Sequence, residues 1–256
     1  MSWQLNVRVA RQRPGDPSVH YDVFTLEVDP DEYVLDVIER IWGQHDRSLM
    51  FRHACHHASC GTCGMRVNGA EKLACVTSIR DVTTDGGTLT VEPLRNLPLV
   101  GDLVVDPAPM FAALAAIGMP IMRSVEAYGE PGAYNRFEDC IECGLCISAC
   151  PLMATSSAYL GPAALAAAER VVEERRSADL PSVLDLVDSE EGCWRCHTAF
   201  ECSEVCPMNV NPAGRIMALR RALMIERIKS LFWRGKTKRP APTTPTPIAP
   251  AASKPH

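Results

Sequence analysis

Apolar and polar side chains alternate in two segments near the N-terminus. Every second residue is apolar in residues 5–9, and the same pattern returns in residues 24–28. A period of two residues places the apolar side chains on one face of an extended chain. We therefore predict two strands here, each with one buried face.

The pattern then changes to the period of a helix. Apolar residues recur at intervals of three and four between residues 34 and 42. We expect Asp29 or Asp31 to cap this helix, with Pro30 in its first turn. The expected buried stripe consists of Val34, Val37, Ile38, Ile41 and Trp42.

A hairpin and a last strand complete this β-rich part. Asn68-Gly69 separates residues 65–67 from a strand that leads to Cys75, and this dipeptide favours a tight turn between strands. Residues 89–91 predict the last strand. Prolines are frequent after it, and we place the end of the first domain at residue 105.

The second domain, residues 106–236, has helical periodicity. Residues 109–122 form an apolar segment that is shorter than the roughly 18 residues needed to cross a bilayer, so we predict a buried helix. An alanine-rich helix is predicted over residues 162–176 and a shorter one over residues 180–187. We expect this domain to be all-helical.

Charge is concentrated near the C-terminus. Nine basic residues and one acidic residue fall within residues 213–239, although the whole chain has a net charge of −5. Apolar residues at helical spacing predict an amphipathic helix here, which either packs on the core or faces an anionic membrane. In the second case Arg220, Arg221 and Arg227 would face lipid or an anchor protein. Residues 237–256, rich in proline, alanine and threonine, are predicted to be disordered.

Twelve cysteines restrict the possible functions. With no signal peptide and no apolar segment long enough to cross a bilayer, the chain is expected to be cytosolic. Cytosolic cysteines at short spacings are typical of metal or cluster ligands. No phosphate loop, dinucleotide-binding turn or nucleophile elbow occurs, so we expect no nucleotide binding or turnover by this chain alone.

A first group of cysteines has the spacing of a plant-type [2Fe-2S] site. Cys55, Cys60 and Cys63 form the CxxxxCxxC motif, and Cys75 is the natural fourth ligand. Four clustered thiols also suit zinc, but zinc ribbons usually combine two CxxC pairs, which this loop lacks. We therefore predict a [2Fe-2S] cluster.

Three histidines in the same loop suggest an alternative. In a Rieske site two histidines replace two of the cysteines, and His53, His56 and His57 are available. Because four cysteines are already present, we interpret these histidines as loop or surface residues.

Two later groups of cysteines repeat a ferredoxin motif. The first is Cys140-x2-Cys143-x2-Cys146-x3-Cys150-Pro, and residues 196–207 repeat it with Ala199 in place of the second cysteine. In two-cluster ferredoxins the fourth cysteine of such a motif binds the other cluster. This rule predicts a [4Fe-4S] cluster with four thiolates and a [3Fe-4S] cluster with three. The two sets are Cys140, Cys143, Cys146 and Cys206, and Cys150, Cys196 and Cys202.

One cysteine remains outside these sets. Cys193 could replace Cys196 as a ligand, but only Cys196 preserves the spacing of the motif, so we predict that Cys193 binds no cluster. Three clusters of different type form a path for electrons, because cluster type, burial and hydrogen bonds to sulfur set each potential.

Together these motifs resemble the iron–sulfur subunits of succinate dehydrogenase and fumarate reductase over residues 3–235. The resemblance implies an α+β fold, with a β-grasp plant-type [2Fe-2S] ferredoxin domain over residues 1–105. An all-α ferredoxin-like domain with two cubane-type clusters follows over residues 106–236. The similar signatures are Phe51-Arg52-x2-Cys55, Leu73-Ala74-Cys75, Leu160-Gly161-Pro162-Ala163, Arg195-Cys196-His197 and Val205-Cys206-Pro207.

The resemblance also implies partners. The [2Fe-2S] domain would dock on a flavoprotein subunit with covalent FAD, and the [3Fe-4S] end would face a membrane anchor and its quinone. Any haem would belong to a partner subunit. Electrons would pass from succinate to quinone, or in reverse to fumarate, and we favour succinate oxidation. The chain would lie at the cytoplasmic face of the inner membrane, held by the anchor.

At the quinone end the resemblance covers fewer residues. Pro151 and His197 match family positions near the quinone or the [3Fe-4S] cluster, although His197 could simply be a hydrogen-bonded residue beside the cluster. Many ubiquinone-linked members have a tryptophan shortly after the first cysteine–proline pair, whereas residues 152–155 contain none. We therefore favour menaquinone.

Two other functions are compatible with the cysteine pattern. The chain could be an electron carrier for another oxidoreductase, such as a glycolate oxidase or heterodisulfide reductase, although these usually lack the N-terminal [2Fe-2S] domain. It could also be a zinc-stapled interaction protein, which would be colourless and free of iron.

Overall fold

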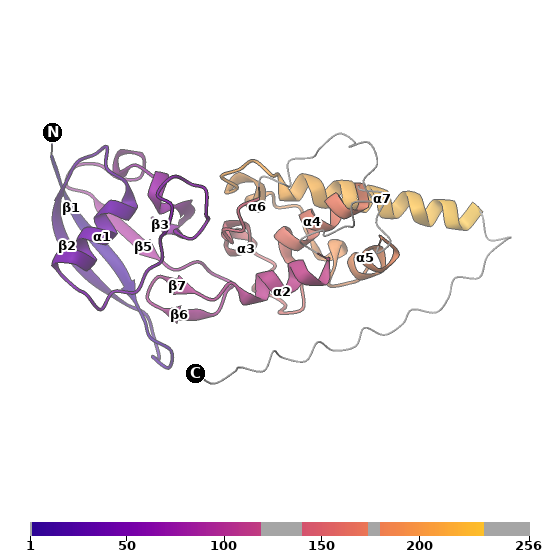
Figure 1. Ribbon diagram of the computed structural model, residues 1–256, viewed down its shortest axis with the longest axis horizontal. Coiled ribbons are helices and arrows are strands. Elements are labelled where there is room, and N and C mark those ends of the chain that lie inside the picture. The colour runs from indigo at the N-terminus through magenta and orange to yellow at the C-terminus, as the bar shows by residue number, and fades with distance from the viewer. Residues whose placement is uncertain (1, 119–139, 174–179, 233–256) are drawn as a thin grey trace.

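The computed structural model describes residues 2–118, 140–173 and 180–232. The molecule is elongated, with a sheet domain at one end and a helical domain at the other (Figure 1). Several predictions fall outside the described residues. These are the disordered tail at 237–256, the ends of the apolar and alanine-rich segments at 119–122 and 174–176, and the basic residues at 234–239.

Five strands form a mixed sheet in the order β2-β1-β5-β3-β4. The central strand pair is parallel and consists of β1 (Trp3–Arg11) and β5 (Thr88–Glu92), while β2 (His20–Val28) lies antiparallel to β1. β3 (Gly64–Val67) and β4 (Ala70–Leu73) form the hairpin predicted from Asn68-Gly69. The predicted alternation is confirmed. The inward residues of β1 are buried, and so are Leu26 and Val28, the last two inward residues of β2.

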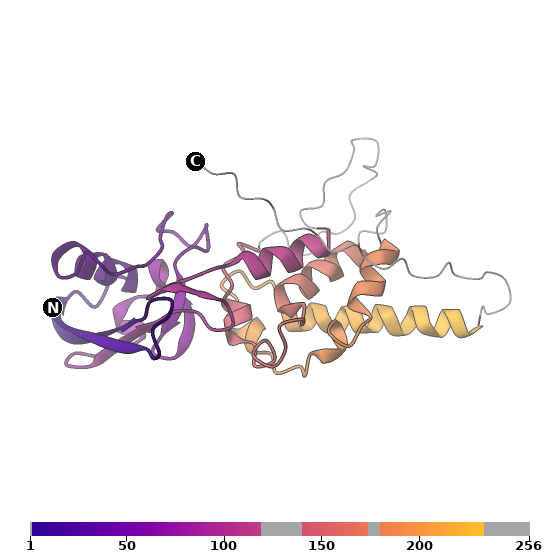
Figure 2. The ribbon, with the colours of Figure 1, turned by 90° about the horizontal axis from the view of Figure 1, so that it is seen from below.

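One helix, α1 (Val34–Gln44), packs against a face of this sheet (Figure 2). The predicted caps were wrong. The helix begins after Tyr33, whose backbone N–H donates a hydrogen bond to the Asp36 carboxylate at 3.0 Å. Residues 29–31 therefore precede the helix, where the carboxylate of Asp29 accepts from the backbone of Asp31 at 2.9 Å.

Trp42 does not belong to the buried stripe of α1, contrary to expectation. Its side chain is 38% exposed, because it lies about 100° around the helix from the buried Ile41. The guanidinium of Arg47 covers one face of its ring, 4.2 Å from the centroid. The Phe51 ring packs edge-on against it at 6.3 Å between centroids.

A short hairpin follows β5, which is therefore not the last strand as predicted. It consists of β6 (Leu99–Gly101) and β7 (Val104–Val105). Asp102 at its turn is buried, and its carboxylate accepts hydrogen bonds from the backbone N–H groups of Gln12 and Met50. The core of the sheet domain includes Val105, and the core of the helical domain begins with Met110. The domain boundary at residue 105 stays a prediction.

The described part of the second domain is helical, as predicted. Four longer helices surround its core, and two short helices lie inside the two cysteine motifs. The longer helices are α2 (Ala108–Ala116), α4 (Gly161–Glu173), α5 (Leu180–Val187) and α7 (Pro212–Phe232), and the short ones are α3 (Leu145–Ala149) and α6 (Glu201–Glu204). The prediction of a buried helix at 109–122 was half right, because Met110 and Leu114 of α2 are buried whereas Phe111 is 43% exposed.

The basic helix exists as α7, and it has two different halves. Its first half packs on α4 through buried residues such as Ile216 and Leu219, and the Arg215 guanidinium bonds the Glu169 carboxylate at 2.7 Å. Its second half projects from the domain (Figures 1 and 2). Across the described residues, no helix is both long and apolar enough to cross a membrane.

Candidate iron–sulfur sites

The cysteines of the first motif lie together beside the sheet. The thiols of Cys55 and Cys60 are within hydrogen-bonding reach of each other, and so are the thiols of Cys63 and Cys75. The loop at 55–63 supplies three of the thiols, and η1 (Ala74–Val76) after β4 supplies the fourth. The structure therefore brings together the four residues predicted to bind a [2Fe-2S] cluster.

Backbone N–H groups of this loop point at sulfur. The N–H of Ser59 lies 3.3 Å from Cys55 Sγ, and the N–H of Ala58 lies 3.4 Å from Cys75 Sγ. Donation from the loop backbone, first from His57, lowers the pKa of Cys55 to about 7, whereas burial raises the pKa of Cys63 to about 12. A buried thiol of this kind loses its proton when a metal takes up the charge, which fits a cluster site.

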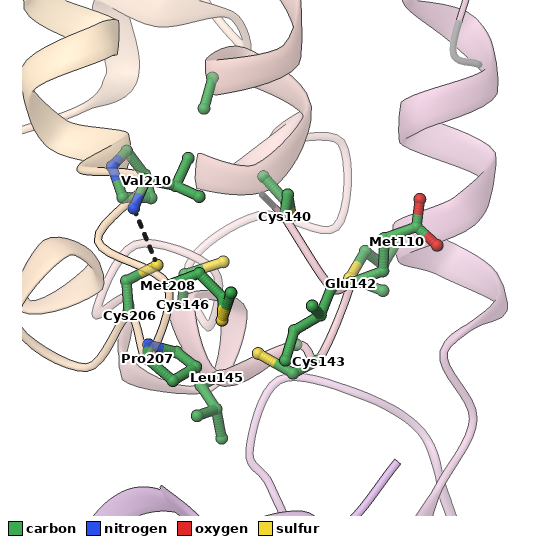
Figure 3. A pocket seen from close by; sticks show the side chains of 15 residues that line it. Met110, Cys140, Glu142, Cys143, Leu145, Cys146, Cys206, Pro207, Met208 and Val210 are labelled. Carbon is green, nitrogen blue, oxygen red and sulfur yellow. Dashed lines mark hydrogen bonds between the residues drawn. The ribbon is translucent and has the colours of Figure 1, made fainter. Parts of the chain in front are cut away.

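A second pocket contains Cys140, Cys143, Cys146 and Cys206 (Figure 3). These are the four residues that the crossing rule predicts for the [4Fe-4S] cluster. Apolar side chains complete the lining, and the N–H of Val210 donates to Cys206 Sγ at 3.4 Å. Burial raises the pKa of Cys143 to about 11 and raises that of Cys146 well above the usual value of a thiol. A set of four converging thiols in apolar surroundings suits a cubane cluster.

A third pocket contains Cys150, Cys196 and Cys202. Ala199 lies in its wall, so the described lining offers three thiols. The N–H of Thr198 donates to Cys196 Sγ at 3.4 Å, and burial raises the pKa of Cys202 to about 11. This donor set fits a cluster that is held by three thiolates.

The Cys140–Cys150 motif and the Cys196–Cys206 motif share one backbone conformation. Glu142 and Thr198, at equivalent positions, have φ angles of 53° and 57°. Gly144 and Phe200 are also equivalent, with φ of 77° and 65°, and each immediately precedes a short helix. A left-handed phenylalanine is unusual. Its presence here shows that the Cys196–Cys206 motif keeps the turn of the Cys140–Cys150 motif, which supports the alignment of Ala199 with Cys143.

Cys193 lies outside both pockets. Its side chain is fully buried in the helical core, and it is absent from the lining of the pockets that hold Cys146 and Cys196. That Cys193 binds no cluster stays a prediction, and its absence from both linings supports it.

The predicted quinone-side residues lie at the third pocket. Pro151 and His197 both line it, and the side chain of His197 is exposed. They remain candidates for the quinone side. The three loop histidines His53, His56 and His57 are exposed, as expected for loop residues.

Two residues that position the motifs were not identified from the sequence. Arg220 would face lipid or an anchor if its helix lay against a membrane, but its guanidinium donates to the backbone carbonyls of Cys193, Trp194 and Cys196. The Asn96 amide donates to three carbonyls of the Cys140–Cys150 motif. The partners of neither side chain are close in sequence, so no local pattern could have revealed these contacts.

Family models match both domains. A 2Fe-2S iron-sulfur cluster binding domain matches residues 6–112, and a 4Fe-4S dicluster domain matches residues 136–210. The fold and the models together define a protein with two iron–sulfur domains. Relatives named fumarate reductase or succinate dehydrogenase iron–sulfur subunit are 30–34% identical over 83–90% of this chain, so the chain belongs to that family.

The relatives cover most of the chain. The fumarate reductase iron–sulfur subunit of Haemophilus influenzae is 34% identical, and the match covers 83% of this chain and 90% of that protein. The corresponding subunit of Mycobacterium tuberculosis is also 34% identical, and the match covers 90% of this chain and 97% of that protein. A mitochondrial succinate dehydrogenase iron–sulfur subunit of Oryza sativa is 30% identical over 83% of this chain and 80% of its own. A chain of the Mycobacterium smegmatis Sdh1 complex has the same fold, with a TM-score of 0.76 at 24% identity, covering 89% of this chain and 98% of that one.

Proposed function

We propose that this chain is the electron-transfer subunit of a succinate:quinone oxidoreductase and has no catalytic activity alone. Its ligands would be the cysteine sets predicted above for [2Fe-2S], [4Fe-4S] and [3Fe-4S] clusters. Such clusters, when bound, accept and release single electrons. The observation that carries the proposal is the series of three thiol groups that begins in the sheet domain and continues through the two cysteine pockets of the helical domain.

Neighbouring groups in this series lie close to one another. The loop of the first motif touches the second motif, where Gly61 lies against Ile141. Cys146 of the second pocket lies near Cys202 of the third, whose charge contributes to its raised pKa. This proximity supports direct electron transfer between successive clusters.

The protein also sets the surroundings of each sulfur. Each of the three groups has a backbone N–H within 3.4 Å of a cysteine sulfur, at Cys75, Cys206 and Cys196. Hydrogen bonds to sulfur and burial both shift the reduction potential of a cluster. The backbone of this chain thus contributes to the order of the three potentials.

A reduction experiment on the complex tests the proposal. The tagged chain is purified with its natural partners from detergent-solubilised membranes, and a flavoprotein with covalent FAD is expected to accompany it. Added succinate should bleach the cluster absorbance. Bleaching by dithionite but not by succinate, in a complex that lacks such a flavoprotein, would point to a carrier for another oxidoreductase.

The direction of the reaction is a separate question. The relatives include fumarate reductase subunits at 34% identity and a succinate dehydrogenase subunit at 30%, so quinol:fumarate reduction is the alternative. We favour succinate oxidation with menaquinone. Rates of succinate oxidation and fumarate reduction by the complex test the direction. Extraction of the quinone from the complex tests its type, and recovery of ubiquinone alone would contradict menaquinone.

The projecting half of α7 is the surface that we assign to a membrane anchor at the cytoplasmic face of the inner membrane. Met224, Ile225 and Ile228 are about half exposed there, and Arg221 is exposed among them. Apolar and basic side chains together suit the boundary between an apolar anchor and anionic lipid headgroups.

A double variant tests this surface. Ile225→Glu with Ile228→Glu should release the chain from membranes, whereas Val23→Glu, at an exposed apolar residue of the sheet domain, should not. Membrane retention of the double variant would remove α7 from the anchor contact and leave the cluster sites unaffected.

A further inference from the structure

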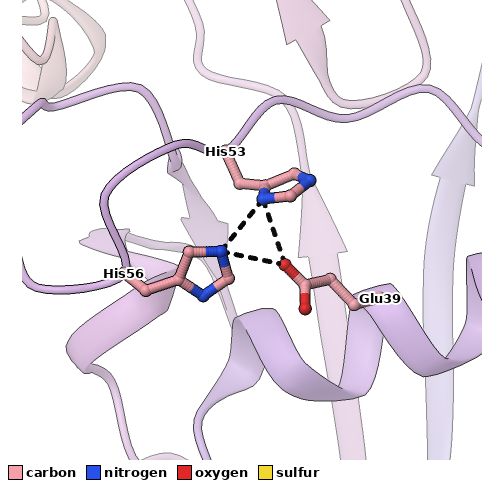
Figure 4. A group of neighbouring side chains, drawn as sticks. All are labelled: Glu39, His53 and His56. Atoms are coloured by element: carbon pink, nitrogen blue, oxygen red, sulfur yellow. Dashed lines mark hydrogen bonds and ion pairs between the residues drawn. The ribbon is translucent and has the colours of Figure 1, made fainter.

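Three potential metal ligands converge between α1 and the loop of the first motif. Glu39 of α1 faces His53 and His56, and Figure 4 shows the carboxylate and both rings directed at one another. None of these residues belongs to the cysteine sets. We propose that they form a binding site for a divalent transition-metal ion of the zinc type.

The distances fit such an ion. His53 Nδ1 lies 3.1 Å from His56 Nε2 and 3.1 Å from Glu39 Oε1, and His56 Nε2 lies 3.3 Å from the same oxygen. In a tetrahedral zinc site with bonds of about 2.0–2.1 Å, neighbouring ligand atoms lie about 3.3 Å apart. The three atoms therefore have the spacing of one face of a zinc tetrahedron.

Hydrogen bonding alone leaves this triangle poorly satisfied. Glu39 Oε1 is shielded from solvent and receives no hydrogen bond of acceptable geometry from the described residues. A hydrogen bond lies along one edge of a triangle, whereas a cation above its centre contacts all three atoms. Two imidazoles and a carboxylate are also ligands that zinc prefers.

The ligands are held in place by their neighbours. The ring of His53 stacks on Phe51, with centroids 5.2 Å apart and planes 14° from parallel. Phe51 in turn packs edge-on against Trp42, which lies one helical turn after Glu39 on α1. The exposed Trp42 therefore connects the helix that carries one ligand to the loop that carries another.

The fourth side of the site is open. The side chains of His53 and His56 are 41% and 43% exposed, so water can complete the coordination. His56 lies between Cys55 and His57 in the loop of the first motif. Its φ of 60° is unusual for a residue other than glycine. A bound ion would fasten this strained part of the loop to α1.

Metal analysis of the cluster-loaded chain tests the site, with zinc as the probe. The full chain, with its clusters intact, is equilibrated with zinc and desalted. Wild type should retain one zinc per chain beyond a cluster-only baseline, and Glu39→Gln and His53→Asn should lose at least nine tenths of it. His57→Asn is the matched control, because this imidazole faces the backbone carbonyl of Cys55 and should leave zinc retention unchanged.

Two further measurements keep the test decisive. Iron per chain should be equal in all samples, and if His53→Asn lost iron, Glu39→Gln would carry the comparison because it lies outside the cysteine loop. X-ray absorption at the zinc edge should show nitrogen and oxygen at about 2.0–2.1 Å and no sulfur near 2.3 Å. Equal zinc in wild type and Glu39→Gln, or a sulfur shell, would overturn the proposal. The outcome does not depend on the electron-transfer role.

Discussion

A Cβ atom on Gly61 would lie 2.5 Å from the carbonyl oxygen of Ile141. Gly61 stands between the second and third cysteines of the first motif, and Ile141 stands between the first and second cysteines of the next. The loop and the helical domain are therefore in backbone contact at the point where two cluster sites meet. Any side chain at this glycine would push the two sites apart.

We predict that Gly61→Ala weakens this contact. Its φ of +69° costs alanine about 1 kcal/mol, and the clash with backbone atoms adds about 1–3 kcal/mol. Gly86→Ala is the matched control, since Gly86 has a φ of +76° and no neighbour within 4 Å of the added carbon. Thermal unfolding of both variants measures the difference, and equal losses would contradict the close packing.

Asn96 is predicted to position the motif that leads to the third pocket. Its Nδ2 donates to the carbonyl oxygens of Ile147, Ser148 and Cys150 at 2.9, 3.1 and 3.1 Å. Asn96→Asp keeps the shape but turns an acceptor toward three acceptors, so we expect a loss of about 2–3 kcal/mol.

The same variant should also reduce the [3Fe-4S] signal in electron paramagnetic resonance, because Cys150 is predicted to bind that cluster. Asn68→Asp is the control, since the Asn68 amide donates to the single carbonyl of Val82 at 2.7 Å. If both variants kept a full signal, Asn96 would have only a structural role.

A pair of cysteine variants separates the ligand from its neighbour. Cys193→Ala should retain the iron content of the wild type, because this side chain is buried outside both pockets. Cys196→Ala should lose the third cluster. Iron and sulfide analysis measures both, and a loss of iron from Cys193→Ala alone would show that the motif was aligned wrongly.

Much of this molecule could be predicted from its sequence because the signals were local. The alternation in residues 5–9 and the turn at Asn68-Gly69 depend on near neighbours, and the structure confirms both. The grouping of cysteines in the two helical pockets came from spacing and a crossing rule. The equivalent turns at Gly144 and Phe200 support the alignment of the two motifs even where a cysteine is missing.

The predictions that were wrong or left open concern contacts across the fold. Trp42 has the spacing of a core residue, but the loop that follows α1 folds back and gives it partners at the surface. For Arg220 the sequence left a membrane-facing and a core-packing helix open, and backbone carbonyls more than twenty residues earlier accept its hydrogen bonds. Helical periodicity reports the side of a helix and carries no information on which segment will cover it.

Ala199 offers a gain-of-ligand test. It lines the third pocket at the position that Cys143 occupies in the second motif, so Ala199→Cys should supply a fourth thiolate and raise the iron content by about one per chain. The new cluster should have a lower potential and reduce quinone more slowly. Ala154→Cys is the control for an added thiol, since Ala154 is exposed and outside the pocket lining.

Electron paramagnetic resonance of the oxidised complex tests the central claim, which is a third site with three thiolates. The wild-type complex should show a [3Fe-4S] signal before any reductant is added, and [2Fe-2S] and [4Fe-4S] signals only after reduction. The Ala199→Cys complex should lose the first signal. An oxidised wild-type complex without a [3Fe-4S] signal, or a variant that keeps it in full, would contradict the assignment.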